Sequence, residues 1–384
     1  MRTEHEIGDA PVIIAARRTP IATRGRALAA LTVEQLAIPV ARALHDDATA
    51  ALGHAPAVAD VVLGNCMGPG GNPARVAALG AGLGFEVPGL TIDRQCGSGL
   101  AAIIEAATAI SAGDERPRIA GGVESASTAP TRSIDGTPYA RAPFTPAGWH
   151  DPGMTQAAQD LATHDGIPRD RQDAYAARSA HRAASAVAAG RLDTELVRLV
   201  DAADRDEPSR PGFDRLLHRF TPLFAGGSLT AGNTCRVSDG AAGVLLVPGA
   251  GHRGEAPGLA IRAHAVIGCD PALPGIGAAP AIIEALDRAG LGVADIGAFE
   301  IVEAFAAQTL AVLDRLGIAD DDERVCADGG ALALGHPWGA SGAVAVVRLF
   351  SRLVRSGAPA GTIGVAAASV GGGLGVAAVF EVVR

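Results

Sequence analysis

The chain has 384 residues, of which 48% are hydrophobic and 19% charged, so it can bury a sizeable core and is not expected to be disordered. Its formal net charge of −9 argues against nucleic acid as a partner, because phosphate binding needs a basic surface. All 32 basic residues are arginines. The absence of lysine excludes Schiff-base chemistry, pyridoxal phosphate and a P-loop lysine, so any phosphate contact must use arginine or backbone N–H groups.

Cysteine usage and the apolar segments suggest a protein of a reducing compartment. The five cysteines form no Cys-x-x-Cys pair and give no zinc pattern; they are Cys66, Cys96, Cys235, Cys269 and Cys326. The first twenty residues lack the apolar core of a signal peptide. Residues 356–380 carry no charge, but Pro359 and the glycine triplet at 371–373 favour two buried strands over a membrane span. We expect a cytoplasmic protein with no membrane partner.

The first third of the chain alternates short β-rich runs with alanine-rich helical stretches. Strands are predicted at 11–22, 58–66, 90–93 and 117–125, and helices at 31–48, 72–83 and 96–113. This alternation predicts a mainly parallel sheet with right-handed connections and helices on its faces.

The middle of the chain differs, and the alternation then resumes. Residues 126–229 are expected to form an insertion over the core, with a long loop at 126–165, a charged amphipathic helix at 169–190 and irregular structure at 201–229. Further strands are predicted at 259–268, 297–305, 362–370 and 375–383, the last two adjacent, with helices at 280–290 and 338–357. A Gly/Ser-rich turn opens a helix at both 96–103 and 338–346, which suggests two similar halves.

Cys96 lies immediately before Gly-Ser-Gly, at the expected start of a helix. The positive end of a helix dipole commonly lowers the pKa of a thiol. Neighbouring glycines allow backbone N–H groups to point at an oxyanion. The alternative is a small buried hydrophobic side chain.

Three further features are individually weak. His336 lies between Gly335 and Pro337 in a loop, where it could deprotonate a thiol or donate to a carbonyl oxygen, or lie by chance. The glycines at 371–373 suit either a ligand approaching bare backbone or a tight hairpin, and both can hold. Glu303 follows an apolar strand, where sites in such sheets lie, but a charge at a helix N-terminus is the simpler interpretation.

Taken together, the motifs resemble the thiolase family along the whole chain. The matching segments are RQCGSGL around Cys96, GGVES at 121–125, NPAR at 72–75, TAGN and SDGAA within 230–242, GGALALGHPWGASG around His336, and VGGGLGVA near the C-terminus. The resemblance implies an α/β thiolase fold: two βαβαβαββ halves in five layers, with an inserted loop domain. The first half would comprise residues 1–125 and 230–256, the loop domain 126–229 and the second half 257–384.

The resemblance also implies a coenzyme A thioester substrate, no tightly bound cofactor, no metal, and a homodimer or homotetramer. Cys96 would be the acyl-accepting nucleophile and His336 its activator, with backbone N–H groups of Cys96 and Gly371 forming an oxyanion hole. The residues expected at the coenzyme A site are Met154, Arg210, Cys235, Ala304 and Phe305, of which Arg210 would face the nucleotide phosphates.

Two positions depart from the family pattern. Val302 stands where the family has the asparagine of Asn-Glu-Ala-Phe, which holds a water for the enolate oxygen. Losing one oxyanion donor typically costs ~10²–10³ in rate. Ser369 stands where the family has the cysteine that acts as acid and base in the Claisen step. Smaller departures are Cys235 at a usual serine and a shorter loop at 128–153.

The acylation half of the reaction is therefore expected to be intact, and the carbon–carbon half to be altered. We expect an acyl-CoA C-acyltransferase of the thiolase type, acting in Claisen condensation or thiolysis through an acyl-cysteine. One alternative is an acyltransferase that passes the Cys96-bound acyl group to a non-enolate acceptor. Another is a catalytically weak subunit that binds coenzyme A thioesters.

Overall fold

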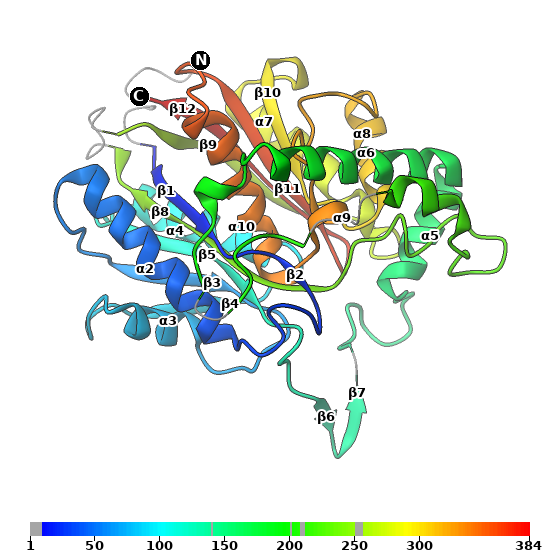
Figure 1. Ribbon diagram of the computed structural model, residues 1–384, viewed down its shortest axis with the longest axis horizontal. Coiled ribbons are helices and arrows are strands. Elements are labelled where there is room, and N and C mark those ends of the chain that lie inside the picture. Colours follow the sequence, from blue (N-terminus) through cyan, green and yellow to red (C-terminus); the bar gives the residue numbers. More distant parts are fainter. Residues whose placement is uncertain (1–9, 140, 200–201, 208–211, 250–255) are drawn as a thin grey trace.

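The computed structural model describes residues 10–139, 141–199, 202–207, 212–249 and 256–384. Its main feature is one large mixed sheet (Figure 1). The strands of the first half are β1 (Val12–Arg18), β2 (Ala22–Thr23), β3 (Asp60–Gly64), β4 (Gly89–Ile92), β5 (Arg118–Glu124) and β8 (Ser238–Val247). Those of the second half are β9 (Gly258–Gly268), β10 (Ile296–Ile301), β11 (Ile363–Val370) and β12 (Leu374–Val383).

The sheet order is β10-β11-β12-β9-β1-β8-β5-β3-β4, with β2 paired to β8. Pairing of β1 with β9 joins the two halves, with Val12 opposite Ala260 and Ile13 opposite Leu259. Only β3–β4, β3–β5 and β10–β11 are parallel among the described pairings of this sheet. The expectation of a mainly parallel sheet is therefore wrong. Strands buried on both faces are continuous apolar runs, and such runs do not reveal strand direction.

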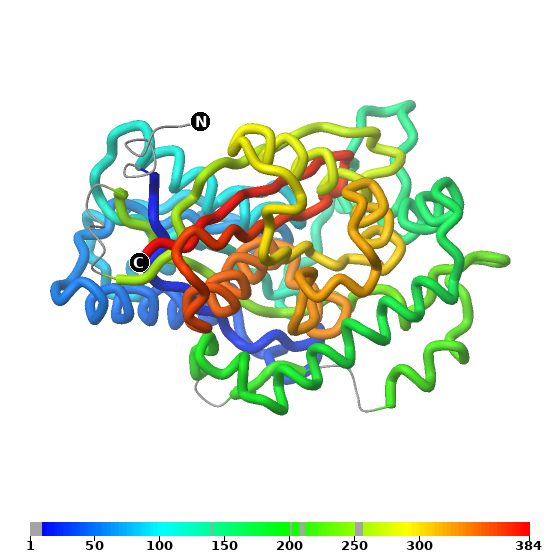
Figure 2. Tube along the Cα trace, turned by 90° about the horizontal axis from the view of Figure 1, so that it is seen from above, coloured from blue at the N-terminus to red at the C-terminus, as the bar shows by residue number. Residues whose placement is uncertain are grey.

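Helices cover the sheet in layers, as the family resemblance of the motifs implies (Figures 1 and 2). The helices are α2 (Val33–Leu52), α3 (Pro73–Ala81), α4 (Ser98–Ser111), α5 (Met154–His164), α6 (Arg169–Ala188), α7 (Ala278–Ala289), α8 (Ala306–Leu316), α9 (Ala331–Leu334) and α10 (Trp338–Leu349). Helices α2 and α3 pack on the outer face of the first-half strands, and α7 and α8 on that of the second half. Helices α4 and α10 lie between the two halves and share a core with both. The expected five-layer arrangement is confirmed.

The middle of the chain is more ordered than its composition predicts. The segment 126–165, expected as a loop, contains the hairpin of β6 (Arg132–Ile134) and β7 (Thr137–Tyr139), and then α5. The hairpin projects away from the body of the molecule (Figure 1). Helix α6 forms as predicted and packs on α8 and α9. Short helical turns complete the chain: η1 (Asp193–Glu195), η2 (Phe213–Arg219), η4 (Pro274–Ile276), η5 (Val293–Asp295) and the π-helical η6 (Phe350–Arg355).

A buried ionic network ties the middle segment to both halves. The Arg18 guanidinium is fully buried and pairs with Glu195 and Asp206, each at 2.6 Å. Arg348 of α10 pairs with the same Glu195 and with Asp328. Guanidinium groups suit such sites because their planar fork binds two carboxylate oxygens at once.

The described residues, 10–139, 141–199, 202–207, 212–249 and 256–384, show neither a membrane-spanning helix nor a cluster of metal ligands. No helix in them is long and apolar enough to cross a membrane. No group of three or more His, Cys, Asp or Glu side chains in them could hold a metal ion.

Candidate active site

Cys96 lies at the start of α4, in a turn whose backbone is fixed by hydrogen bonds. The preceding residue, Gln95, has a φ of +47°, in the left-handed region that few side chains adopt. The Ser98 hydroxyl fixes this turn by donating to the Gln95 carbonyl at 2.6 Å and accepting from the Arg94 N–H at 2.7 Å. Cys96 is half-buried and faces a cavity. Strained backbone of this kind often marks a functional position.

Glycines bring α4 and α10 into backbone contact. A Cβ atom on Gly99 would lie 2.9 Å from the Gly339 carbonyl oxygen, and one on Gly342 would lie 2.7 Å from the Leu100 nitrogen. Larger residues would therefore push the helices apart. Because Cys96 precedes α4 and His336 precedes α10, this packing brings the two side chains to one site.

His336 is held in one tautomer by its neighbours. Its backbone N–H donates to the Arg236 carbonyl at 2.8 Å, and its Nδ1 lies 2.6 Å from the Ser341 hydroxyl oxygen. That hydroxyl donates to the Pro337 carbonyl at 2.9 Å, so Nδ1 must supply the proton it shares with Ser341. Nε2 is left deprotonated and has no partner among the described residues. Burial lowers the pKa of His336 to about 4, which keeps the ring neutral and able to accept a proton.

One cavity of about 300 Å³ collects most of the residues expected from the sequence. Its lining includes Cys96, His336, Ser369, Gly371, Met154, Cys235, Ala304 and Phe305. The four residues expected beside coenzyme A are drawn together partly by the Cys235 N–H, which donates to the Ala304 carbonyl at 3.0 Å. Arg210 lies outside the described residues.

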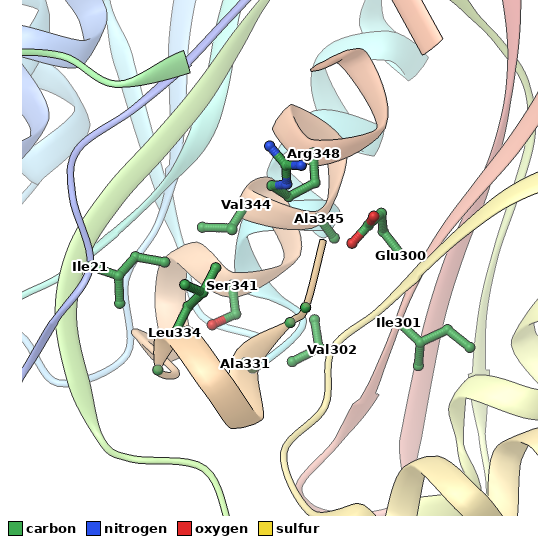
Figure 3. Close-up of a pocket in the computed structure, with 13 residues that line it drawn as sticks. Ile21, Glu300, Ile301, Val302, Ala331, Leu334, Ser341, Val344, Ala345 and Arg348 are labelled. Atoms are coloured by element: carbon green, nitrogen blue, oxygen red, sulfur yellow. The ribbon is translucent and has the colours of Figure 1, made fainter. Parts of the chain in front are cut away.

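Val302 does not face the Cys96 cavity. It lines a second, smaller cavity of about 30 Å³ between β10 and α10, together with Glu300, Ser341 and Arg348 (Figure 3). The Val302 side chain is 5% exposed and belongs to the central core. It therefore offers no hydrogen bond to a ligand beside Cys96. This second cavity adjoins His336 through Gly335 and through the Ser341 hydroxyl.

The Ser369 hydroxyl has a structural task. It donates to the Gly275 carbonyl at 2.6 Å and accepts from the Ala278 N–H at 3.0 Å, at the start of α7. The Gln308 amide lies 3.5 Å away. A hydroxyl whose proton is already directed at a backbone carbonyl is poorly placed to exchange protons with a substrate.

The pKa of the Cys96 thiol differs from the lowered value that the sequence predicts. Enclosure by protein raises its pKa to about 12, and the nearby charges of Glu124 and Asp93 raise it further, while its own backbone N–H opposes the change. The lowered pKa expected from the helix dipole is therefore wrong for the resting site. Burial is the largest cause of the raised pKa, so the thiol is protonated at rest and needs a base when it reacts.

Glu124 is a site residue whose role sequence reasoning missed. Its buried carboxylate accepts from the N–H groups of Cys66 at 3.2 Å and Met67 at 3.1 Å, and from that of Gly339 at 3.0 Å. Asn65 adds a side-chain bond at 3.2 Å. Glu124 thus fixes the loop after β3 against the start of α10. A lone glutamate ending an apolar strand was the available signal.

The glycine triplet serves both purposes considered for it. Val370 pairs with Leu374 across the β11–β12 turn, and Gly372 and Gly373 have φ values of +85° and +77°. Gly371 lines the cavity, where a Cβ atom would lie 2.7 Å from the Phe144 ring. The turn therefore needs two glycines, and the third leaves bare backbone beside the ligand space.

Glu303 faces away from the Cys96 cavity. It accepts from the Tyr175 hydroxyl at 2.9 Å and the Ser179 hydroxyl at 2.7 Å, both on α6, and from the Leu332 N–H of α9 at 3.4 Å. Burial raises its pKa. Glu303 therefore attaches α6 to the second half, a structural role that differs from the charge at a helix N-terminus considered from the sequence.

The arrangement matches known proteins over nearly the whole chain. The model of the thiolase N-terminal domain matches residues 11–250, and that of the thiolase C-terminal domain matches residues 256–382. The chain belongs to the thiolase family. It is accordingly an acyltransferase, and the resemblance seen in its motifs is confirmed.

Individual relatives agree with this assignment. A Staphylococcus haemolyticus protein named "Putative acetyl-CoA C-acetyltransferase VraB" is 40% identical, covering 96% of this chain and 98% of its own. A Staphylococcus aureus protein of the same name is 39% identical over the same shares. The crystal structure of the Bacillus anthracis acetyl-CoA acetyltransferase superposes with a TM-score of 0.89 at 34% identity, over 98% of this chain and 99% of that one.

Proposed function

We propose that this thiolase-family protein is an acyl-CoA C-acyltransferase that forms an acyl-thioester on Cys96. The supporting observation is the shared cavity, which brings together a thiol, a neutral histidine with a free Nε2, and the residues expected beside coenzyme A. The relatives named above act, by their names, on acetyl-CoA, which makes acetyl-CoA the first donor to test.

The acylation step needs no group that the site lacks. The Cys96 sulfur attacks the thioester carbon while His336 Nε2 takes the thiol proton. The bond from carbon to the coenzyme A sulfur then breaks, and that sulfur receives the proton from His336. The products are acyl-Cys96 and free coenzyme A. Backbone N–H groups of Cys96 and Gly371 would stabilise the negative oxygen formed during the transfer.

The carbon–carbon half of the reaction has weaker support. A Claisen condensation needs a base for the α-proton and donors for the enolate oxygen. Ser369 directs its proton to Gly275, and Val302 is apolar and faces another cavity. These observations favour a second candidate, in which acyl-Cys96 passes its acyl group to an acceptor that needs no enolate.

The pantetheine arm of coenzyme A would pass Met154, Cys235, Ala304 and Phe305, all of which line the cavity. Coenzyme A thioesters would be the substrates, with no tightly bound cofactor. We further propose a homodimer or homotetramer in the cytoplasm, as is common in this family.

Intact-protein mass spectrometry after mixing with acetyl-CoA and longer acyl-CoAs tests the proposal, with Cys96→Ala as the control. A mass gain of one acyl group that is absent in Cys96→Ala would support the acyl-cysteine. The gain should then disappear on adding the acceptor, either acetyl-CoA or a nucleophile such as an amine or alcohol. No gain with any thioester would contradict the proposal and favour a subunit that only binds coenzyme A thioesters.

A further inference from the structure

The Cys96 cavity contains an arginine without a carboxylate partner. Arg132 lines the cavity and is half-buried at the base of the β6–β7 hairpin, where it pairs with Tyr139 across the strands. One guanidinium nitrogen, Nη2, donates to the Cys66 carbonyl. Within the described residues, Arg132 has no carboxylate within 4 Å. A cation partly withdrawn from water in a ligand cavity is a candidate anion-binding group.

A series of contacts connects this guanidinium to the segment that carries the nucleophile. Arg132 touches the backbone of Cys66, and the Cys66 thiol donates to the Gln95 carbonyl at 3.1 Å. Gln95 is the residue before Cys96. Arg132 and Cys96 therefore line the same cavity and are connected through Cys66 and Gln95, on the side of the loop after β3. The residues expected beside the pantetheine arm come from other segments, in α5 and around 235 and 304.

The other charged side chains of the cavity, those of Arg141 and Asp93, form contacts within the protein. Arg141 pairs with the Asp151 carboxylate at 2.8 Å and stacks on the Phe144 ring, 4.5 Å from its centroid. Asp93 is the one carboxylate among the described lining residues, and its Oδ1 accepts from the Gln95 N–H at 2.8 Å. Arg132 and Asp93 are thus the charged lining groups for which the described residues provide no ion pair, and of these two only the Arg132 cation can attract an anion.

We propose that Arg132 binds a carboxylate at the far end of the acyl group, so that the preferred substrates are coenzyme A thioesters of dicarboxylic acids. This inference rests on the proposed function and names its substrate class. The bound carboxylate would pair with the guanidinium nitrogens not used by Cys66, in the fork geometry that arginine and carboxylates share. A substrate without that carboxylate would leave the charge unpaired in a partly desolvated site.

Binding in the Cys96→Ala background tests the inference without turnover. Calorimetry would compare succinyl-, glutaryl- and adipyl-CoA with butyryl-, pentanoyl- and hexanoyl-CoA, which match them in chain length. We expect at least one dicarboxylic thioester to bind about tenfold or more tightly than its match, as a charge-assisted pair would allow. Adding Arg132→Met should abolish that ratio, and Arg132→Lys should keep part of it. Arg116→Met removes an arginine whose side chain is 64% exposed, outside the cavity, and should leave the ratio unchanged.

Each ratio compares two ligands on one protein preparation, so a partly unfolded variant does not alter it. A ratio that stays the same in Arg132→Met overturns the inference, as does a parent protein that binds every monoacyl thioester more tightly than its dicarboxylic match. Acylation of Cys96 in the otherwise unmodified protein is measured separately. Acylation by butyryl-CoA with no effect of Arg132 would refute only the substrate class, whereas binding without any acylation would refute only the proposed function.

Discussion

The hydroxyl of Ser369 donates to the carbonyl of Gly275 across 2.6 Å, at the turn that leads into α7. The same oxygen receives the first free N–H of that helix, from Ala278. Ser369 thus satisfies one carbonyl of the short turn η4 and one N–H at the start of α7, which would otherwise be left unpaired. These two contacts indicate a structural role for Ser369 rather than a catalytic one.

The first prediction concerns stability. Ser369→Ala leaves the Gly275 carbonyl and the Ala278 N–H without their partner, so the free energy of unfolding should fall by about 1–3 kcal/mol. Urea denaturation followed by circular dichroism measures this. Ser133→Ala, at an exposed position, should change it by no more than about 0.5 kcal/mol. Equal effects of the two substitutions would show that the hydroxyl contacts do not stabilise the fold.

The second prediction concerns the carbon–carbon step. Restoring the family residues in the double variant Val302→Asn, Ser369→Cys should raise the rate of acetoacetyl-CoA thiolysis, by up to ~10²-fold, because Ser369→Cys places an acid–base group in the Cys96 cavity. Val302→Asn alone should add little, since position 302 faces the second cavity. Loss of absorbance by the enolate of acetoacetyl-CoA follows the reaction. The two single variants are the controls. If the double variant gains nothing, these groups are not what limits thiolysis.

The third prediction follows from His336. Its pKa is lowered from 6.5 to about 4 on folding, so the unfolded chain binds more protons between these values. Stability should therefore decrease as the pH falls from 6.5 to 4, by up to about 3 kcal/mol from this residue. Buried acids such as Glu303, whose pKa is raised, act in the opposite direction. The measurement is therefore the difference in unfolding free energy between the parent protein and His336→Gln across that pH range. This difference should become smaller at low pH. A constant difference would mean that the ring is not held neutral.

The fourth prediction follows from the protonated thiol. With the pKa of Cys96 raised to about 12, its alkylation by iodoacetamide should quicken with pH and show no plateau below about pH 10. Mass spectrometry of the Cys96 peptide gives the rate, and a small free thiol with an ordinary pKa gives the comparison curve. A plateau near neutral pH would reveal a resting thiolate paired with a charged histidine.

The fifth prediction compares two ion pairs. Glu195→Ala removes the fully buried carboxylate shared by Arg18 and Arg348, and should cost about 3–5 kcal/mol because two buried guanidinium groups each lose one of their two carboxylate partners. Glu284→Ala breaks an exposed pair with Arg288 on α7 and should cost less than about 1 kcal/mol. Thermal unfolding of both variants checks the contrast, and similar losses would indicate that the buried network is not stabilising.

The motifs predicted much of this molecule because its chemistry depends on local patterns. A thiol before Gly-Ser-Gly and a histidine between glycine and proline both lie at helix starts, and local sequence decides where helices start. The β11–β12 hairpin follows from its glycine triplet. The sequence pattern also identified α6, because its charged and apolar faces repeat with helical period.

The features that the sequence did not predict depend on tertiary contacts. Strand β8 is buried at all ten positions, so it has no alternation to reveal it. Helix α5 lies in a segment rich in turn-forming residues and is stabilised by packing on α8. The raised pKa of Cys96 reflects how deeply the folded chain encloses it, which no motif records. The task of Glu124 depends on Gly339, a residue 215 positions away.

The glycine contacts between α4 and α10 limit how this enzyme can acquire new chemistry. Backbone touches backbone at Gly99 and Gly339, so a larger side chain there would push the helices apart and separate the nucleophile from its histidine. Selection and protein engineering must instead act on residues that surround a fixed pair. Positions 302 and 369 at the second-half strands and Arg132 on the hairpin are such residues. The same pair of Cys96 and His336 can thereby act on different acyl groups and different acceptors. Each such change can evolve while the pair itself stays the same.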